Sequence, residues 1–406
     1  MTVLRDYQQE AVKRVMWELN TRPSGNAVIS LPTGAGKSLV IAEIAKAVDR
    51  PLLILQPSKE ILEQNLEKLL RHADRADVGV YSAAMGEKTV SRITLATIQS
   101  IYTKPELFSH VGLVIIDECH LVNPKSTGTM FRGFLAQIGS PKVIGLTATP
   151  WRMDTMYTPG DYGGFDIVTT TKVITRMKGI FWNRILYNIS IAELIERGHL
   201  VKPTYYDNSK IRHSDIPRNK SASEFNLDAY EQLIQQDEER IVDTVVRAQA
   251  MSQSVLVFCL SVEQAQRFAR VVAGSAVVHA KTTVKERTRV IEGFKSGAIK
   301  TVFNVSCLTT GFDHPELDCI ILIRPTRSIG LYYQMCGRGV RLAPGKTTCK
   351  VIDFSGTVAE LGKIESIRLE RPGGGKWDIV SSRGTWHGRA LYKFEKKEEK
   401  AVNFNF

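Results

Sequence analysis

The chain has 406 residues, which is too long for one ordinary hydrophobic core and predicts two or three domains. Its composition, with 43% hydrophobic and 24% charged residues, is typical of a folded protein and argues against a disordered chain. The formal net charge of +12 favours a polyanionic partner, although solubility alone would also explain it. No apolar run approaches the roughly 20 residues that span a bilayer, and the first ten residues carry charges where a signal peptide would be apolar. We therefore expect no membrane contact and a cytoplasmic or nucleoid-associated protein.

Residues 4–19 predict an amphipathic helix with an unusually polar start. The amide of Gln8 has the donor and the acceptor that pair with adenine, as glutamine does when it reads adenine in DNA. Gln8 is therefore a candidate for selecting ATP, with Arg5 or Tyr7 against the base. From these residues alone, a solvated helix start is the better explanation.

A short apolar strand is predicted over residues 27–31 and a helix over residues 39–48, with the string LPTGAGKS between them. A glycine-rich turn that opens a helix leaves backbone N–H groups free to bind phosphates, and the helix dipole favours the anion. Lys37 would contact the β- and γ-phosphates, and Ser38 would place its hydroxyl on Mg²⁺. The strict motif has glycine where this chain has Leu31, so an ordinary strand-to-helix turn is the alternative. The candidate nucleotide-binding residues of this turn are Thr33, Gly34, Ala35, Gly36, Lys37 and Ser38.

A second strand, turn and helix follow from residue 51, with the turn at Pro57 and Ser58. This turn points to the same sheet edge as the first and can present Pro57 and Ser58 to a sugar-phosphate backbone. Capping of the helix would explain Ser58 equally well. Another strand is predicted over residues 92–98, ending in the string ATIQS.

In the string LVIIDECH at residues 113–120, an apolar run is followed directly by two carboxylates. A strand that is apolar on both faces belongs in the middle of a parallel sheet, and ligands bind at its carboxyl end. Asp117 would hold Mg²⁺ through water, and Glu118 would orient or deprotonate the water that attacks the γ-phosphate. A solvated strand end is the alternative, and it fits poorly because the phosphate loop and the carboxylates follow separate strands in the expected order.

A further buried strand over residues 143–150 ends in Thr147 and Thr149. Beside His120, the two hydroxyls would pass the state of the nucleotide to a second domain. A threonine-rich turn without such a role is an equal alternative.

The ordered motifs resemble those of the superfamily 2 helicases and translocases. The strings that carry the resemblance are RDYQQ, LPTGAGKS, ILQPSKE, ATIQS, IIDECH and GLTATP in the first half, and TVFNVSCLTTGFDHP and YYQMCGRGVRLAPGK in the second. Arg338 and Arg341 lie three residues apart and so share one helix face, as needed if they are to reach a γ-phosphate held by the other domain. A generic basic helix is the alternative.

The resemblance implies an α/β fold of two tandem RecA-like lobes with parallel central sheets, ATP at their interface and a short C-terminal extension. The implied domains are an ATP-binding domain at 1–150, a linker or insertion at 151–200, a second RecA-like domain at 201–356 and the extension at 357–406.

The roles implied by the resemblance fall into five groups. The catalytic residues would be Lys37, Asp117, Glu118, Gln334, Arg338 and Arg341. Beyond the phosphate loop, the nucleotide would be held by Arg5, Gln8, Gly311 and Asp313. His120, Thr147 and Thr149 would couple hydrolysis to movement. Mg²⁺ would be bound by Ser38 and Asp117. The nucleic acid would touch Pro57, Ser58, Thr97, Ser261, Thr309 and Thr310.

Within the superfamily, the DECH box and the strings IAELIERGHLVKP and RPTRSIGLYYQMCGRGVRLAPGK are most similar to the RadD-type bacterial repair helicases and related phage proteins. The R subunits of restriction enzymes share the core. RadD-type proteins continue into a cysteine-bearing tail, whereas this sequence has no cysteine after Cys349, so we carry over no contact made by that tail.

The expected function is that of an ATP- and Mg²⁺-dependent DNA helicase or translocase in replication, recombination or repair. Its partners would be DNA and a single-strand-binding protein or another repair or replication protein. The alternatives are an RNA-dependent ATPase and a nucleotide-gated clamp or motor subunit that does not separate strands, as in restriction complexes.

Two stretches remain without a firm assignment. Residues 151–184 lack clean periodicity and predict an insertion or a mobile loop. Their cations Lys172, Arg176, Lys178 and Arg184, with Phe181 and Trp182, would either grip nucleic acid or simply dock the loop. The glycine- and tryptophan-containing tail from residue 371 predicts a small strand pair or a frayed end.

Overall fold

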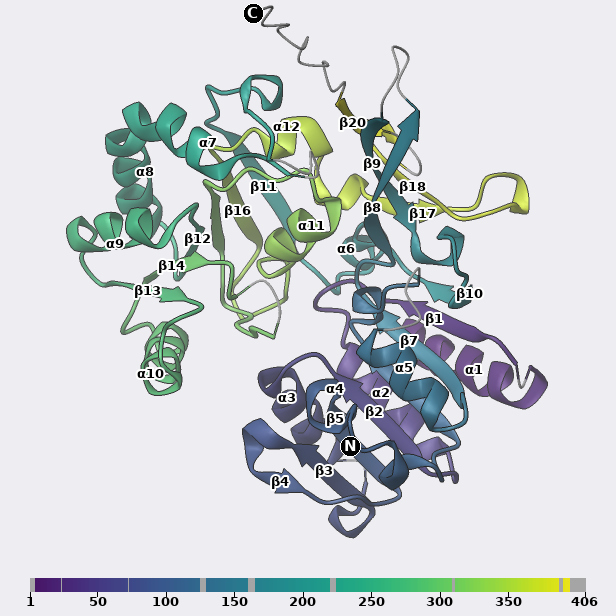
Figure 1. The fold of residues 1–406 in the computed structure, drawn as a ribbon. Coiled ribbons are helices and arrows are strands. Elements are labelled where there is room, and N and C mark those ends of the chain that lie inside the picture. Colours follow the sequence, from purple (N-terminus) through teal and green to yellow (C-terminus); the bar gives the residue numbers. More distant parts are fainter. Residues whose placement is uncertain are drawn as a thin grey trace, which may run out of the picture.

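The computed structural model describes residues 4–22, 24–71, 73–124, 129–159, 165–219, 224–308, 311–386 and 390–394. Two α/β lobes, each built on its own sheet, follow one another along the chain (Figure 1). This is the predicted fold class. Among the described residues, no helix is both long and apolar enough to cross a membrane.

The first lobe is an eight-stranded sheet with the order β10-β1-β7-β6-β2-β5-β3-β4, in which only the β3–β4 pair is antiparallel. Its strands are β1 (Asn26–Ser30), β2 (Leu52–Gln56), β3 (Val78–Ser82), β4 (Glu87–Lys88), β5 (Ile93–Thr97), β6 (Leu113–Asp117), β7 (Lys142–Thr147) and β10 (Trp182–Asn188). Its helices are α1 (Asp6–Thr21), α2 (Lys37–Ala47), α3 (Lys59–Leu69), α4 (Ile98–Ile101) and α5 (Met130–Gln137). Every residue of β2, β5 and β6 is buried, which explains why these strands read as continuous apolar runs.

The second lobe is a six-stranded parallel sheet with the order β11-β16-β15-β12-β14-β13. Its strands are β11 (Lys202–Asp207), β12 (Val255–Phe258), β13 (Ser275–His279), β14 (Thr301–Val305), β15 (Cys319–Leu322) and β16 (Thr348–Asp353). Its helices are α7 (Leu227–Ile234), α8 (Glu238–Ala250), α9 (Val262–Val271), α10 (Val284–Lys295), α11 (Ile329–Gly337) and α12 (Thr357–Leu361), and α6 (Ile191–Glu196) connects the lobes. The carboxyl ends of both sheets therefore supply loops to one interface.

The prediction of a linker or insertion at 151–200 needs correction, because much of this stretch forms strands. Strand β10 pairs with β1 and completes the first sheet, so the first lobe extends beyond the predicted 1–150. The stretch from residue 151 begins with a hairpin of β8 (Trp151–Pro159) and β9 (Phe165–Val173) rather than a loop, and β20 (Ala390–Phe394) pairs with β9. The C-terminal extension adds β17 (Arg368–Glu370), β18 (Asp378–Ser381) and β19 (Gly384–Thr385), which confirms the strand-pair alternative for the tail.

Trp182 anchors β10 to the first lobe, and its replacement should destabilise that lobe. Its side chain is fully buried, lies edge-on to Phe181 with ring centroids 4.8 Å apart, and fills the space above Gly145. We expect Trp182→Ala to lower the free energy of unfolding by about 3–5 kcal/mol, because a buried ring is replaced by a cavity. Urea denaturation followed by circular dichroism measures this. The control Trp17→Ala, at a ring that is 52% exposed, should cost less than about 1 kcal/mol; equal losses would contradict the anchoring role.

Candidate active site

The loop between β1 and α2 has the conformation that the phosphate-binding hypothesis requires. Gly34 and Gly36 have φ of 86° and 77°, in the left-handed region that glycine adopts without steric cost. No described residue accepts a hydrogen bond from the backbone N–H groups of Gly36, Lys37 or Ser38. These groups therefore remain at the N-terminus of α2 to bind an anion, which fits a nucleotide phosphate.

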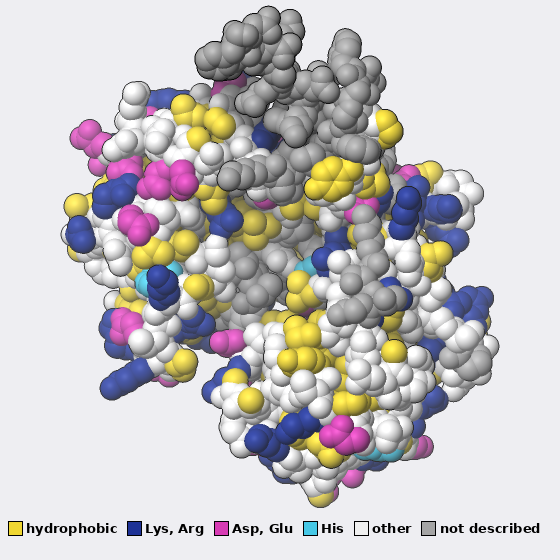
Figure 2. Space-filling view, in the orientation of Figure 1, with side chains coloured by type: hydrophobic (Ala, Val, Ile, Leu, Met, Phe, Trp, Pro, Cys, Tyr) yellow, Lys and Arg dark blue, Asp and Glu magenta, His cyan; other side chains and the backbone are white. Residues whose placement is uncertain are grey.

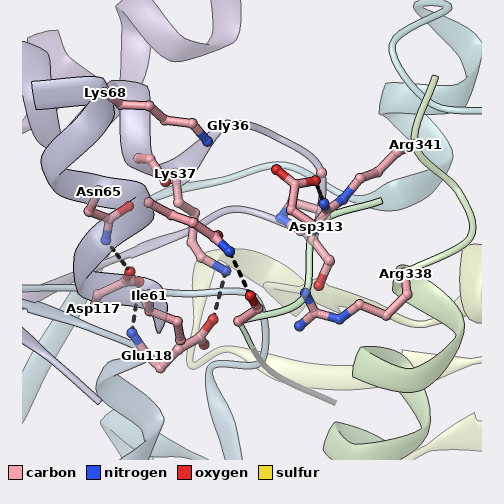
Figure 3. A pocket seen from close by; sticks show the side chains of 16 residues that line it. Gly36, Lys37, Ile61, Asn65, Lys68, Asp117, Glu118, Asp313, Arg338 and Arg341 are labelled. Carbon is pink, nitrogen blue, oxygen red and sulfur yellow. Dashed lines mark hydrogen bonds and ion pairs between the residues drawn. The ribbon is translucent and has the colours of Figure 1, made fainter. Parts of the chain in front are cut away.

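Lys37 lies opposite the two carboxylates at the end of β6. Its Nζ is 3.1 Å from Glu118 Oε1, and both side chains are largely buried (Figure 3). The backbone N–H of Glu118 donates to Asp117 Oδ1 over 2.9 Å, and Asn65 Nδ2 donates to Asp117 Oδ2 over 2.9 Å. Glu118 has φ of 48°, a strained conformation for a residue other than glycine. The turn thus aims two neighbouring carboxyl groups at the phosphate loop.

Burial and charge separate the acidities of these two carboxyl groups. Burial, together with the neighbouring Glu118, raises the pKa of Asp117. Burial also acts to raise the pKa of Glu118, but the Lys37 ammonium and the His120 ring outweigh it and hold this pKa well below its usual range. Glu118 is therefore ionised and able to accept a proton or orient water. A cation beside Asp117 would favour its ionised form, which fits the predicted Mg²⁺ site formed with the Ser38 hydroxyl.

The second lobe contributes two arginines to the same pocket. Arg338 Nη1 donates to the carbonyl of Phe312 over 2.8 Å, and Arg341 forms an ion pair with Asp313. Burial lowers the pKa of each guanidinium to about 10, so both remain cationic at neutral pH. Each side chain points into the pocket across from Lys37 (Figure 3).

One pocket of about 170 Å³ is lined by both lobes. It brings together these predicted residues: Thr33, Gly34, Gly36, Lys37, Ser38, Asp117, Glu118, Gly311, Asp313, Arg338 and Arg341. A nucleotide phosphate placed here would meet cations from both lobes, so its presence or absence would change the attraction between the lobes.

Sequence reasoning missed a third wall of this pocket, which α3 provides. Ile61, Gln64, Asn65 and Lys68 all line it, and Gln64 Nε2 donates across the lobes to the carbonyl of Gly311 over 2.6 Å. Their spacing of three to four residues places them on one helix face. This spacing was the signal in the sequence that could have revealed the third wall, but polar residues at such a spacing are equally typical of a solvated helix face.

Comparisons with known proteins agree with this geometry. A family model described as "Type III restriction enzyme, res subunit" matches residues 1–152, and one described as "Helicase conserved C-terminal domain" matches residues 237–343. The two matched models and the relatives named as helicases make the chain similar to the superfamily 2 helicases over both lobes. Assignment to the RadD-type subgroup stays a prediction.

Three relatives illustrate the similarity. The chain is 27% identical to the putative ATP-dependent helicase IRC3 of Saccharomyces cerevisiae, over 87% of this chain and 52% of that protein. It is 30% identical to a 51.5 kDa protein of a Lactococcus phage, over 79% of this chain and 64% of the relative. It is 25% identical to the DNA 3'-5' translocase XPB2 of Sulfurisphaera tokodaii, over 83% and 78%. The chain thus spans only about half to two thirds of the first two relatives.

Solved structures show the same fold. A fragment of a putative HsdR subunit of a type I restriction enzyme from Vibrio vulnificus superposes with a TM-score of 0.65 at 21% identity, covering 89% of this chain and 66% of that one. The Saccharomyces cerevisiae protein Dbp5, bound to RNA and ADP BeF3, gives a TM-score of 0.57 at 14% identity, covering 89% and 87%. Both show the same fold of two lobes.

Arg5 and Gln8 lie behind the phosphate loop and do not line the pocket. Gln8 Nε2 donates to the carbonyl of Ala35 over 2.9 Å, and Gln8 Oε1 accepts from the backbone N–H of Arg5 over 2.9 Å. A Cβ atom on Gly36 would lie 2.4 Å from Gln8 Nε2, so the second glycine is required for this contact. Gln8 therefore supports the loop in this structure, and the reading of adenine by Gln8 and Arg5 stays a prediction.

The three predicted coupling residues form one cluster. His120 Nδ1 lies 2.8 Å from Thr147 Oγ1, 3.3 Å from Thr149 Oγ1 and 3.4 Å from Glu118 Oε2. Gln334 lies in an adjoining pocket of about 330 Å³ with His120 and Thr149, and not in the phosphate pocket. Arg152, at the start of β8, donates to the carbonyl of His120. The cluster therefore links the hydrolytic carboxylate to the hairpin and to α11.

Three of the predicted nucleic-acid residues, Ser58, Thr97 and Ser261, make local structural contacts. Ser58 caps α3 by accepting from the N–H of Ile61, and Ser261 caps α9 and donates to Glu231. Thr97 Oγ1 lies 2.8 Å from Ser100 Oγ, and Pro57 follows the buried end of β2. Thr309 and Thr310 lie outside the described residues. Contact of this set with nucleic acid stays a prediction.

Proposed function

We propose that the chain is an ATP-dependent DNA helicase or translocase that acts in replication, recombination or repair. The observation that carries the proposal is the pocket in which Lys37 and Glu118 of the first lobe face Arg338 and Arg341 of the second. A hydrolytic site divided between two lobes is what a motor needs, because the attacked phosphate then controls the distance between the lobes.

The mechanism follows from the charges in the pocket. The N–H groups of the phosphate loop and Lys37 bind the β- and γ-phosphates, while Ser38 and Asp117 hold Mg²⁺, which neutralises phosphate charge when bound. Glu118 orients the attacking water and accepts its proton. Arg338 and Arg341 stabilise the negative charge that develops on the γ-phosphate.

Movement would arise from the coupling cluster. Loss of the γ-phosphate removes the attraction for Arg338 and Arg341, and the shift of Glu118 reaches His120 through their 3.4 Å contact. His120 in turn touches Arg152 and the two threonines, so the hairpin and α11 sense the same event. We further propose a cytoplasmic or nucleoid-associated location and a single-strand-binding or other repair protein as partner.

ATP hydrolysis by the purified chain tests this proposal. We expect weak hydrolysis alone and strong stimulation by single-stranded, duplex or forked DNA that declines as salt is raised, because counterions are released on binding. Stimulation by RNA alone would favour the RNA-dependent alternative. No stimulation by any nucleic acid would contradict the proposal.

A motor subunit that does not unwind is the second candidate. It is favoured by the match of residues 1–152 to a restriction-enzyme subunit model. Displacement of a labelled strand from a partial duplex distinguishes the two candidates. ATP-dependent displacement by the chain alone supports a helicase, whereas DNA-stimulated hydrolysis without displacement supports a translocating subunit.

A further inference from the structure

A basic hollow lies away from the ATP pocket, between the insertion and the C-terminal extension. It has a volume of about 680 Å³, against about 170 Å³ for the ATP pocket. Its walls are the segment 175–185, which leads into β10, and the segment 371–377, which leads into β18. The function proposed above makes no use of this hollow.

Arg176 joins the two walls of the hollow, and Arg184 fixes one wall to α1. Arg176 forms an ion pair with Asp378 and donates to the carbonyl of Trp377 over 3.1 Å. Arg184 lies 3.2 Å from the buried Glu18, which also pairs with Lys142. Two of the five cations in the hollow, Arg176 and Arg184, are thus already paired with carboxylates of the protein.

The other three cations are available to a ligand. Lys178, Arg371 and Lys376 are exposed and form no ion pair with any carboxylate in the described part of the chain. Lys and Arg side chains are spread over the face shown in Figure 2, including its right-hand side, where Figure 1 places β10, β17 and β18. Like charges held this close repel one another, so a bound anion would relieve their repulsion.

An aromatic ring completes the hollow. Trp377 is half-buried, and the Arg371 guanidinium lies 5.9 Å from its ring centre, held there by donation from Arg371 Nε to the Gly375 carbonyl over 2.6 Å. Ile180, 66% exposed, adds apolar surface.

We propose that this hollow binds a single strand of nucleic acid, with phosphates on Lys178, Arg371 and Lys376 and a base stacked on Trp377. Cations beside an aromatic ring are the combination that binds single strands regardless of sequence. An acidic protein segment would satisfy the cations but would make no use of the ring, so the strand accounts for more of the hollow. This proposal rests on the proposed function, and it adds a second site at which the protein contacts nucleic acid.

The position of the hollow separates it from the expected nucleic-acid path. It adjoins the start of β10, at one edge of the first sheet, whereas Ser58 follows the end of β2. Four strand spacings lie between β10 and β2, which is about 20 Å. A strand held here would therefore be anchored beside the motor while the motor moves along another segment.

The test compares Lys178→Glu/Lys376→Glu with the matched control Lys13→Glu/Lys46→Glu, which makes the same change in net charge at exposed lysines outside the hollow. Binding of fluorescent oligo(dT) and oligo(U) is measured over a range of salt concentrations without ATP. We expect the first variant to weaken binding about ten-fold and to lower the slope of log affinity against log salt by about 1.4, since two phosphate contacts are lost. Hydrolysis in the absence of nucleic acid should not change.

Trp377→Ala tests the stacking separately and should weaken oligonucleotide binding roughly ten-fold with little change in the salt slope. The proposal is overturned if the Lys178/Lys376 variant and the Trp377 variant both bind oligonucleotides as tightly as the parent. It is also overturned if Trp377→Ala leaves oligonucleotide binding unchanged while poly-glutamate binds the hollow through the two lysines. These results leave the motor assignment intact. Failure of the parent chain to bind any nucleic acid would overturn both proposals.

Discussion

Replacing Lys37 by alanine is expected to lower the rate of ATP hydrolysis by about 100- to 1000-fold. The ammonium is the loop's own cation for the β- and γ-phosphates, and it also lies 3.1 Å from Glu118. Its removal leaves the phosphate charge less stabilised and also takes away the ion-pair partner of Glu118. Steady-state phosphate release at saturating DNA measures the effect.

A matched control lies on the same helix. Lys46 is exposed in the last turn of α2, so Lys46→Ala should hydrolyse ATP at the parental rate. Binding of DNA without nucleotide should stay within a few-fold in both variants, because neither residue lies on the expected nucleic-acid path. Hydrolysis retained by Lys37→Ala would remove the assignment of the phosphate loop.

Glu118→Gln should bind ATP but hydrolyse it about 100- to 10,000-fold more slowly, the contribution expected of a positioned general base. The amide keeps the shape of the side chain and loses the proton-accepting charge. ATP should then persist between Lys37 and the two arginines, holding the lobes together. Filter binding with labelled ATP and DNA measures the retained complex.

Glu106→Gln, at an exposed carboxylate of the same lobe, is the control and should behave as the parent. The parent should release DNA as ATP is consumed, whereas Glu118→Gln should retain both ligands. Rapid loss of ATP by the variant would argue that another group activates the water.

Local sequence pattern predicted most of the first lobe. β2 and β6 are buried on both faces, so their apolar runs are continuous, and the polar residues that end them mark the sheet edge. The turn at Gly34 and Gly36 was equally visible, because only glycine adopts its backbone conformation without steric cost.

The interpretation failed where a segment depends on a distant partner. Residues 151–184 were predicted as an insertion or a mobile loop, yet β9 pairs with β8 on one side and with β20, near the other end of the chain, on the other. For Trp182, the sequence left nucleic-acid contact and docking as equal alternatives, and its full burial against Gly145 supports docking. Threonine-rich strands that pair over long range leave no strong period in their own sequence.

The sequence by itself predicted the candidate groups: the phosphate loop with Lys37, the carboxylates Asp117 and Glu118, and the two arginines that follow α11, because each follows from residue types at fixed local spacing. Only the tertiary structure decided which groups share a space. It placed the Gln64 amide on the Gly311 carbonyl, turned Gln8 toward the loop, and brought Lys178 to Lys376 in one hollow. The physical reason is that these contacts arise when sheets and helices pack, and packing joins residues whose separation along the chain leaves no periodic trace.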